Sequence, residues 1–292
     1  MEPLSELPPD VARWLERWAL VPDGDLLTTR SSWVLHVRHE ASTAMLKVAR
    51  IPDEAAGFRL LSWWEGQGAA RVFESAQGVL LIERASGAGD LAQMAWSGQD
   101  DEACRILCDT AARLHAPRRG AMPELHPLED WFRPLLELAT TNTTLAPAAE
   151  IASELLATPR EVVALHGDLH HENVLDFGER GWLAIDPHGL RGERTFDYAN
   201  LFTNPDLSDP GRPLATLPGR FERRLEIVVA AAGLDPQRLL RWIVAWTGLS
   251  AAWFIGDGDD GAPGAAIDLA INTIARGLLD SGGSGRGRPH GA

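Results

Sequence analysis

The chain has 292 residues, of which 45% are hydrophobic, and a formal net charge of −14 at pH 7. This length suffices for one large domain or two lobes around a sizeable core. The acidic balance disfavours a nucleic-acid partner, which would need a basic surface, and is compatible with a cationic substrate. The N-terminus has no basic segment followed by an apolar one, so a secretion signal is not predicted and we expect a cytoplasmic protein.

The first third of the chain is predicted to combine strands with two helices. Its apolar residues follow strand-like runs, and an early proline and carboxylates after residue 51 are typical of a helix start. A glycine-rich stretch at 86–89 then loosens the chain. We therefore place the end of a first lobe at residue 84. Its predicted elements are a helix over 11–19, strands over 26–37 and 44–49, a helix over 52–64, and strands over 72–73 and 79–82.

The remainder is predicted to be mainly helical. Cys104 and Cys108 lie four residues apart on one predicted helix, which favours two small buried side chains over a disulfide. The apolar stretch 242–255 is short and interrupted by polar residues, so it indicates a buried helix and no membrane span. Residues 281–292 have almost nothing apolar to bury, and we expect a disordered tail. The predicted helices cover 101–115, 128–139, 148–157, 218–232, 236–253 and 265–279.

One segment carries the residue types of a phosphoryl-transfer site. Protein kinases have the loop H-R-D-x-x-x-x-N, whose Asp accepts the proton of the attacking hydroxyl and whose Asn holds magnesium. Residues 166–173 read HGDLHHEN, which sets Asp168 and Asn173 at the same spacing. Asp186 follows a second strand-like run, where kinases place another magnesium ligand. The spacing predicts Asp168 as the base, and Asn173 and Asp186 as ligands of Mg²⁺.

A second signal is Lys47, the only lysine among 27 lysine and arginine residues. It lies in a strand-like run where a kinase fold carries the lysine that grips the nucleotide phosphates; an isolated surface charge is the alternative. We expect Glu54 to be its ion-pair partner, with Glu65 as the second choice, although Glu54 also suits the positive end of a helix. By position, the backbone of Glu83 and Ala85 is expected to bind the adenine of ATP.

Two interpretations remain open around the loop. His166 is expected to brace it, and Asp197 is expected either to brace the same loop or to cap a nearby helix. The pattern His-x-Asp-x-His over 166–170 also suits a divalent metal, so a zinc-dependent hydrolase is an alternative. That alternative leaves Lys47 without a role.

These segments resemble the aminoglycoside phosphotransferases, in particular the group of streptomycin 6-phosphotransferases and hydroxyurea kinases. The resemblance implies an α+β, bilobal protein-kinase-like fold, with a small antiparallel sheet in the N-lobe (1–84) and a larger helical C-lobe (85–280). It also implies ATP and Mg²⁺ as cofactors, with the roles given above for Lys47, Asp168, Asn173 and Asp186. The matching stretches are 165–174, 181–187 and 196–201, with weaker likeness at 45–48 and 249–253.

The resemblance specifies the phosphate donor more fully than the molecule that accepts the phosphate. Residues 26–33 contain no glycine, so the phosphate-covering loop lacks the G-x-G-x-x-G pattern of protein kinases, and hydroxyls or amides of Ser31 and Ser32 are expected to substitute for it. The implied activity is phosphorylation of streptomycin at its 6-hydroxyl; a kinase of hydroxyurea or another small alcohol, and an inactive kinase-fold binding module, are the alternatives. Carboxylates that would hold the guanidinium groups of streptomycin, if they are not simply solvated, are Glu222, Glu226, Asp257, Asp259 and Asp260.

Overall fold

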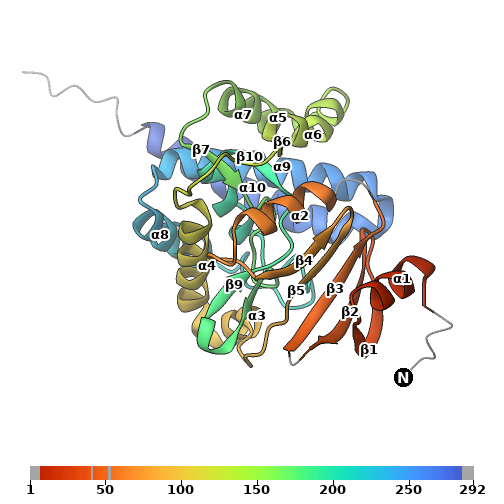
Figure 1. Cartoon of the computed structure of the whole chain (residues 1–292). Coiled ribbons are helices and arrows are strands. Elements are labelled where there is room, and N and C mark those ends of the chain that lie inside the picture. Colours follow the sequence, from red (N-terminus) through yellow and green to blue (C-terminus); the bar gives the residue numbers. More distant parts are fainter. Residues whose placement is uncertain (1–6, 41, 52–53, 285–292) are drawn as a thin grey trace, which may run out of the picture.

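The structure, a computed structural model, describes residues 7–40, 42–51 and 54–284, with the side chains of 259, 260 and 282–284 left outside that description. It has the predicted α+β architecture: strands dominate the first part of the chain, and helices follow (Figure 1). The strands are β1 (Val21–Thr28), β2 (Ser32–His39), β3 (Ser42–Ala49), β4 (Val72–Ala76), β5 (Val79–Glu83), β6 (His126–Pro127), β7 (Val162–Leu165), β8 (Val174–Asp176), β9 (Trp182–Ala184) and β10 (Leu190–Glu193). The α-helices are α1 (Pro9–Arg17), α2 (Glu54–Trp63), α3 (Leu91–Met94), α4 (Asp100–His115), α5 (Leu128–Trp131), α6 (Arg133–Leu138), α7 (Ala146–Ala157), α8 (Arg220–Ala232), α9 (Pro236–Gly256) and α10 (Ala262–Ser284).

The N-terminal sheet is antiparallel, and in the described residues its strand order is β1-β2-β3-β5-β4. Side chains alternate between its two faces, as strand geometry requires. On β5, Leu81 packs into the cluster that holds Leu15 of α1, whereas the adjacent Leu80 packs into the cluster that holds Phe58 of α2. The two helices therefore cover opposite faces, and Figure 1 shows them on either side of the red and orange strands.

Several predicted boundaries differ from the structure. The strand predicted over 26–37 is two strands, β1 and β2, which are joined by a turn in which Thr29 Oγ1 accepts a hydrogen bond from the Ser32 amide. The helix predicted over 128–139 is interrupted after Trp131 because Pro134 cannot donate to the preceding turn. The helix α10 continues to Ser284, so residues 281–284 of the predicted tail are helical, and 285–292 lie outside the described residues.

The helix α9 forms the centre of the helical part. It is long and apolar enough to cross a membrane by composition, but 72% of its most apolar window is buried inside the fold. Trp242 and Trp246 of α9 contact the ring of Phe196 edge to face at centroid distances of 5.7 and 5.8 Å, respectively. Cys104 and Cys108 of α4 are buried and free, as the sequence predicted. Burial against α7, α10 and the aromatic rings thus accounts for the apolar composition of α9.

Candidate active site

The loop 166–173 connects β7 to β8, and the ring of His166 holds it in place. His166 is fully buried; its Nε2 lies 2.8 Å from the Ile185 carbonyl oxygen, and its Nδ1 accepts a hydrogen bond of 3.2 Å from the Asp168 amide. This arrangement requires the neutral tautomer with a proton on Nε2. Burial lowers the pKa of His166, which agrees with a neutral ring. His166 therefore braces the loop, and both ring nitrogens are occupied.

Asp197 braces the same loop from outside. Its carboxylate accepts hydrogen bonds of 2.8 Å from the amides of His166 and Gly167. It also lies 2.8 Å from Nε2 of His115 on α4. Asp197 lies inside the 3₁₀ turn Arg194–Tyr198 and not at its N-cap position. Of the two predicted roles, its position agrees with bracing the loop and not with capping a helix.

Asp168 and Asn173 lie at opposite ends of the loop and are in direct contact. The Asn173 amide group donates 2.8 Å to the Asp168 carbonyl and 2.9 Å to its Oδ2. Burial raises the pKa of Asp168, but His170, with Nε2 3.4 Å from Oδ2, outweighs burial and brings the pKa below its usual value. Asp168 is thus an ionised carboxylate in the position that the sequence predicted for the base.

Asp186 reaches this loop through the hairpin β8–β9. The amide of Ile185 donates 2.9 Å to the carbonyl of Asn173, which sets Asp186 next to Asn173. Asp186 has φ of 61°, in the left-handed region that non-glycine residues seldom adopt. Its side chain is 51% exposed, so the strained backbone directs a carboxylate into an open space.

Lys47 joins this group from the N-terminal sheet. Its ammonium lies 3.0 Å from Glu54 Oε2 and forms a second ion pair and hydrogen bond with Asp186 Oδ1. The Lys47 side chain is only 9% exposed, and its Nζ stands 5.5 Å above the ring of Phe58. Glu54 is therefore the partner that the structure places at Lys47, whereas Glu65 is exposed.

A cavity of about 300 Å³ opens directly at this ion-pair cluster. Lys47 and Asp186 line it together with Asp25, Thr29 and His36, and apolar side chains, most of them from β1, β2, β3, β5 and α2, form the other walls. A mostly apolar slot that also holds charged groups suits a flat base attached to phosphates. Sequence reasoning did not predict these wall residues. A usable signal was that strand side chains two positions from Lys47 face the same side of the sheet as Lys47. The apolar walls are Leu27, Val34, Met45, Phe58, Leu61, Leu80, Ile82 and Ile185.

The donor set fits Mg²⁺ better than zinc. The nitrogen of the Asn173 amide is used by Asp168, which leaves its oxygen for a cation, and Asp186 adds an exposed carboxylate. Magnesium commonly takes one or two such oxygens and completes its shell with phosphate and water. Among the described residues, no group of three or more His, Cys, Asp or Glu side chains is placed to hold a metal.

The residues expected to contact the nucleotide elsewhere have mixed placements. Ser32 is fully buried and its amide donates to Thr29, so its placement does not support phosphate binding; Thr29 lines the cavity instead. Ser31 is half-buried at the same turn. Glu83 uses its amide to donate 2.8 Å to the carbonyl of Arg71, so that amide is not available to adenine.

Comparison with known proteins decides the family. Residues 17–258 match the model of the aminoglycoside/hydroxyurea antibiotic resistance kinases. The chain belongs to this family. It is 76% identical over 266 residues to a streptomycin 3''-kinase of Klebsiella pneumoniae, covering 91% of this chain and 100% of that protein. It is 32% identical to a streptomycin 6-kinase of Streptomyces glaucescens, covering 94% of this chain and 90% of that protein.

Solved structures of other proteins share the fold of this chain. An aminoglycoside phosphotransferase, a thermostable mutant of APH(4)-Ia in complex with AMP-PNP and hygromycin B, superposes with a TM-score of 0.62 at 15% identity, covering 96% of this chain and 100% of that chain. The bilobal kinase-like fold predicted from the sequence is therefore confirmed. The 6-hydroxyl as acceptor position is not confirmed, because the relative at 76% identity is named a 3''-kinase.

The predicted acceptor carboxylates of this family member lie in different places. Glu222 and Glu226 are exposed on α8, beside α4 in Figure 1, and Glu226 pairs with Arg223. Neither lines the cavity at Lys47. Asp257 is exposed at the C-terminal end of α9. The side chains of Asp259 and Asp260 lie outside the described ones.

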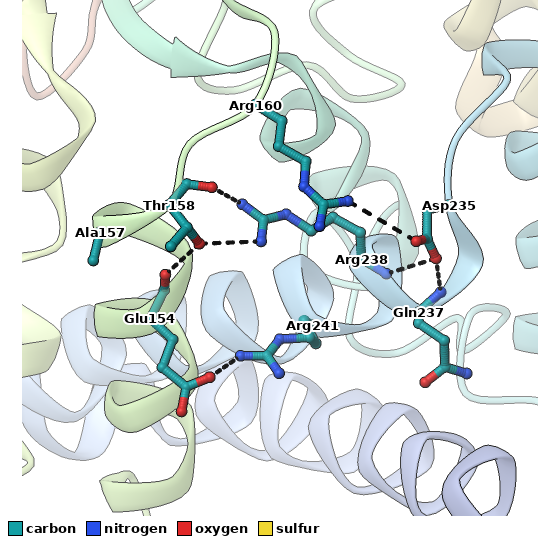
Figure 2. Close-up of a pocket in the computed structure, with 8 residues that line it drawn as sticks. All are labelled: Glu154, Ala157, Thr158, Arg160, Asp235, Gln237, Arg238 and Arg241. Atoms are coloured by element: carbon teal, nitrogen blue, oxygen red, sulfur yellow. Dashed lines mark hydrogen bonds and ion pairs between the residues drawn. The ribbon is translucent and has the colours of Figure 1, made fainter. Parts of the chain in front are cut away.

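A larger cavity of about 510 Å³ lies between the end of α7 and the start of α9 (Figure 2). Its arginines are already paired: Arg238 with the buried Glu193, Arg241 with Glu154, and Arg160 with Asp235. Figure 2 shows Arg238 also directed at Thr158, to whose carbonyl it donates 2.7 Å. The Arg241–Glu154 pair joins α9 to α7, and the Arg238–Glu193 pair joins α9 to β10. None of the predicted site residues lines this cavity.

Proposed function

We propose that this chain transfers the γ-phosphoryl group of ATP to the 3''-hydroxyl of streptomycin. The observation that carries the kinase assignment is that Lys47 from the sheet contacts both Glu54 and Asp186, beside Asn173 and Asp168. Use of ATP is supported by the AMP-PNP that the structural relative binds. The relative named a 3''-kinase, at 76% identity, favours this hydroxyl over the 6-hydroxyl of the relative at 32%.

Each residue has a defined task in the proposed reaction. Lys47, steered by Glu54, binds the phosphates of the nucleotide, and the carbonyl of Glu83 with the backbone of Ala85 binds the base. Asn173 and Asp186 would hold Mg²⁺, which would supply positive charge to offset that of the phosphate oxygens. Asp168 orients the acceptor hydroxyl and takes its proton, because a loose transition state depends chiefly on positioning.

An aromatic surface next to Asp186 is the proposed place of the acceptor. The exposed ring of His188, two residues after Asp186, lies 4.8 Å from Trp131, which in turn contacts Trp253 at 5.5 Å. Indole faces attract guanidinium groups through stacking and cation–π contact. Asp257 follows Trp253 by one helical turn and adds a carboxylate at the same end of α9. We therefore favour Asp257 over Glu222 and Glu226 as an acceptor contact.

The test is ATP turnover with streptomycin, hygromycin B, hydroxyurea and simple alcohols in parallel, with and without Mg²⁺. We expect Mg²⁺-dependent ADP formation with streptomycin, and a product whose phosphorus couples to the 3'' proton in NMR. Coupling to the 6 proton would move the acceptor site. Turnover with hydroxyurea alone would support the alternative within the family, and no turnover with any acceptor would favour the inactive binding module.

A further inference from the structure

Asn200 touches the carboxylate of Asp168 from outside the catalytic loop. It begins the 3₁₀ turn Asn200–Phe202, is buried at 3% exposure, and donates its Nδ2 hydrogen to Asp168 Oδ1 at 2.7 Å. A side-chain donor held this close to an ionised carboxylate forms a strong, charge-assisted hydrogen bond. Neither the kinase loop pattern nor the roles assigned above include this residue.

The orientation of the Asn200 amide is fixed by its neighbours. Asn204 donates 2.8 Å to Asn200 Oδ1 and 3.1 Å to its carbonyl, so the nitrogen of Asn200 must face Asp168. The Asn204 carbonyl accepts 2.6 Å from Arg224, which Asp100 holds through two hydrogen bonds of 3.0 and 2.6 Å. These side chains are all buried, and they connect the start of α4 and the helix α8 to the base.

The two oxygens of Asp168 are consequently in different environments. Oδ2 faces Asn173 at 2.9 Å and His170 at 3.4 Å. Oδ1 is contacted by Asn200 alone among the described residues, so one of its lone pairs remains for a further donor. A rotation of the carboxylate would break the bonds to Asn173 and Asn200 together.

We propose that Asn200 is a positioning residue that fixes the rotation of the Asp168 carboxylate and thereby assigns Oδ1 as the proton acceptor; this rests on the proposed kinase function. The acceptor O–H bond breaks and its proton passes to Oδ1 of Asp168. The acceptor oxygen forms a bond to the γ-phosphorus of ATP, and the bond from phosphorus to the bridging oxygen breaks with its electron pair going to ADP. Asn200 acts only through its hydrogen bond to the Asp168 carboxylate.

The test compares Asn200→Asp with Asn200→Ala. Asn200→Asp keeps the shape and the acceptor for Asn204 but sets a second carboxylate against Oδ1, and two such groups share a proton. We expect kcat to fall roughly 100-fold or more in Asn200→Asp and less in Asn200→Ala, with the KM for ATP and the ATP affinity from calorimetry unchanged. In an Asp168→Asn background, loss of Asn200 should lower the residual turnover no further.

The matched control is Asn272→Ala, which removes a buried asparagine of α10 that makes hydrogen bonds of 3.0 and 2.9 Å to Val244 and Thr247. It should lose stability and keep kcat. A wild-type kcat in Asn200→Asp, or the same fold-loss with and without Asp168, would overturn the inference while wild-type turnover still supported the kinase. Absence of wild-type turnover would instead remove the proposed function and this inference together.

Discussion

Gly57 of α2 lies so close to Pro187 that a Cβ atom at Gly57 would stand 1.9 Å from the Pro187 carbonyl oxygen. The contact is reciprocal, since a Cβ at Gly189 would meet the backbone of Ala56 at 2.4 Å. Helix α2 also carries Glu54, and Pro187 directly follows Asp186. Backbone contact between these two segments therefore sets the distance between the two carboxylates that share Lys47.

Gly57→Ala should destabilise the protein, although alanine normally favours a helix. The added methyl group must displace a backbone carbonyl, and such overpacking costs about 1–3 kcal/mol. The control is Gly277→Ala in α10, where a Cβ meets nothing within 4 Å, and which should gain about 0.5–1 kcal/mol. Urea unfolding measures both variants. Equal stability of the two would show that α2 and Pro187 are not in contact.

Asp168→Asn should reduce turnover to a small residual rate and keep nucleotide binding. The amide retains the shape of the side chain but cannot take the acceptor proton, and general-base contributions are about 10²–10⁴-fold. ADP release by a coupled assay gives kcat, and calorimetry with AMP-PNP gives the affinity. Retained turnover would remove the assignment of Asp168 as the base.

Lys47→Met should lower kcat/KM for ATP by about 100-fold, because the cation that is proposed to bind the phosphates is lost. Lys47→Arg should restore little, since the planar guanidinium is larger and the Lys47 side chain is 9% exposed between Glu54 and Asp186. Initial rates against ATP concentration measure both. Full activity of Lys47→Arg would mean that charge alone suffices and that the site tolerates a different geometry.

Asp268→Asn should raise stability at neutral pH. Asp268 of α10 is fully buried, and neither of its oxygens has a hydrogen-bond partner among the described residues. Burial raises the pKa of Asp268 well above its usual value. The folded protein thus keeps a proton that the unfolded chain releases above about pH 3.9, so this group lowers stability as pH rises from there through the folded pKa.

The asparagine carries no ionisation, so the gain should be on the order of 1 kcal/mol or more at pH 7 and should vanish toward pH 4. Thermal unfolding across this pH range measures it. Asp109→Asn is the control, because Asp109 is 75% exposed and paired only on the surface with Arg113, and its removal should change stability little. A pH-independent effect of Asp268→Asn would show that Asp268 is ionised in the folded protein.

The predicted site residues that the structure places close together are those with a local sequence pattern. Asp168, Asn173 and Asp186 follow apolar strands at kinase-like spacing, and Lys47 is conspicuous in a chain of arginines. Glu54 was found because it starts the next helix. These signals need only the order of neighbouring residues, and the helices and strands around them follow from apolar periodicity.

The residues that sequence reasoning missed depend on contacts between distant segments. Asn200 lies 32 positions from Asp168, and nothing in the intervening sequence indicates that their side chains meet. The turn at Thr29 was predicted as part of one strand, so the burial of Ser32 was not foreseen. Glu222 was chosen by charge alone, which does not show which side of the molecule a helix presents.

The position of Lys47 also determines how the molecule reacts with electrophiles. Since the chain has no other lysine, Lys47 carries its only side-chain amine, and this group lines the cavity together with residues of β1 and β2. Amine-selective reagents, apart from the N-terminal amine, would consequently modify a single site. Covalent labelling of this protein would report on access to this cavity, and a nucleotide bound there as proposed would protect Lys47.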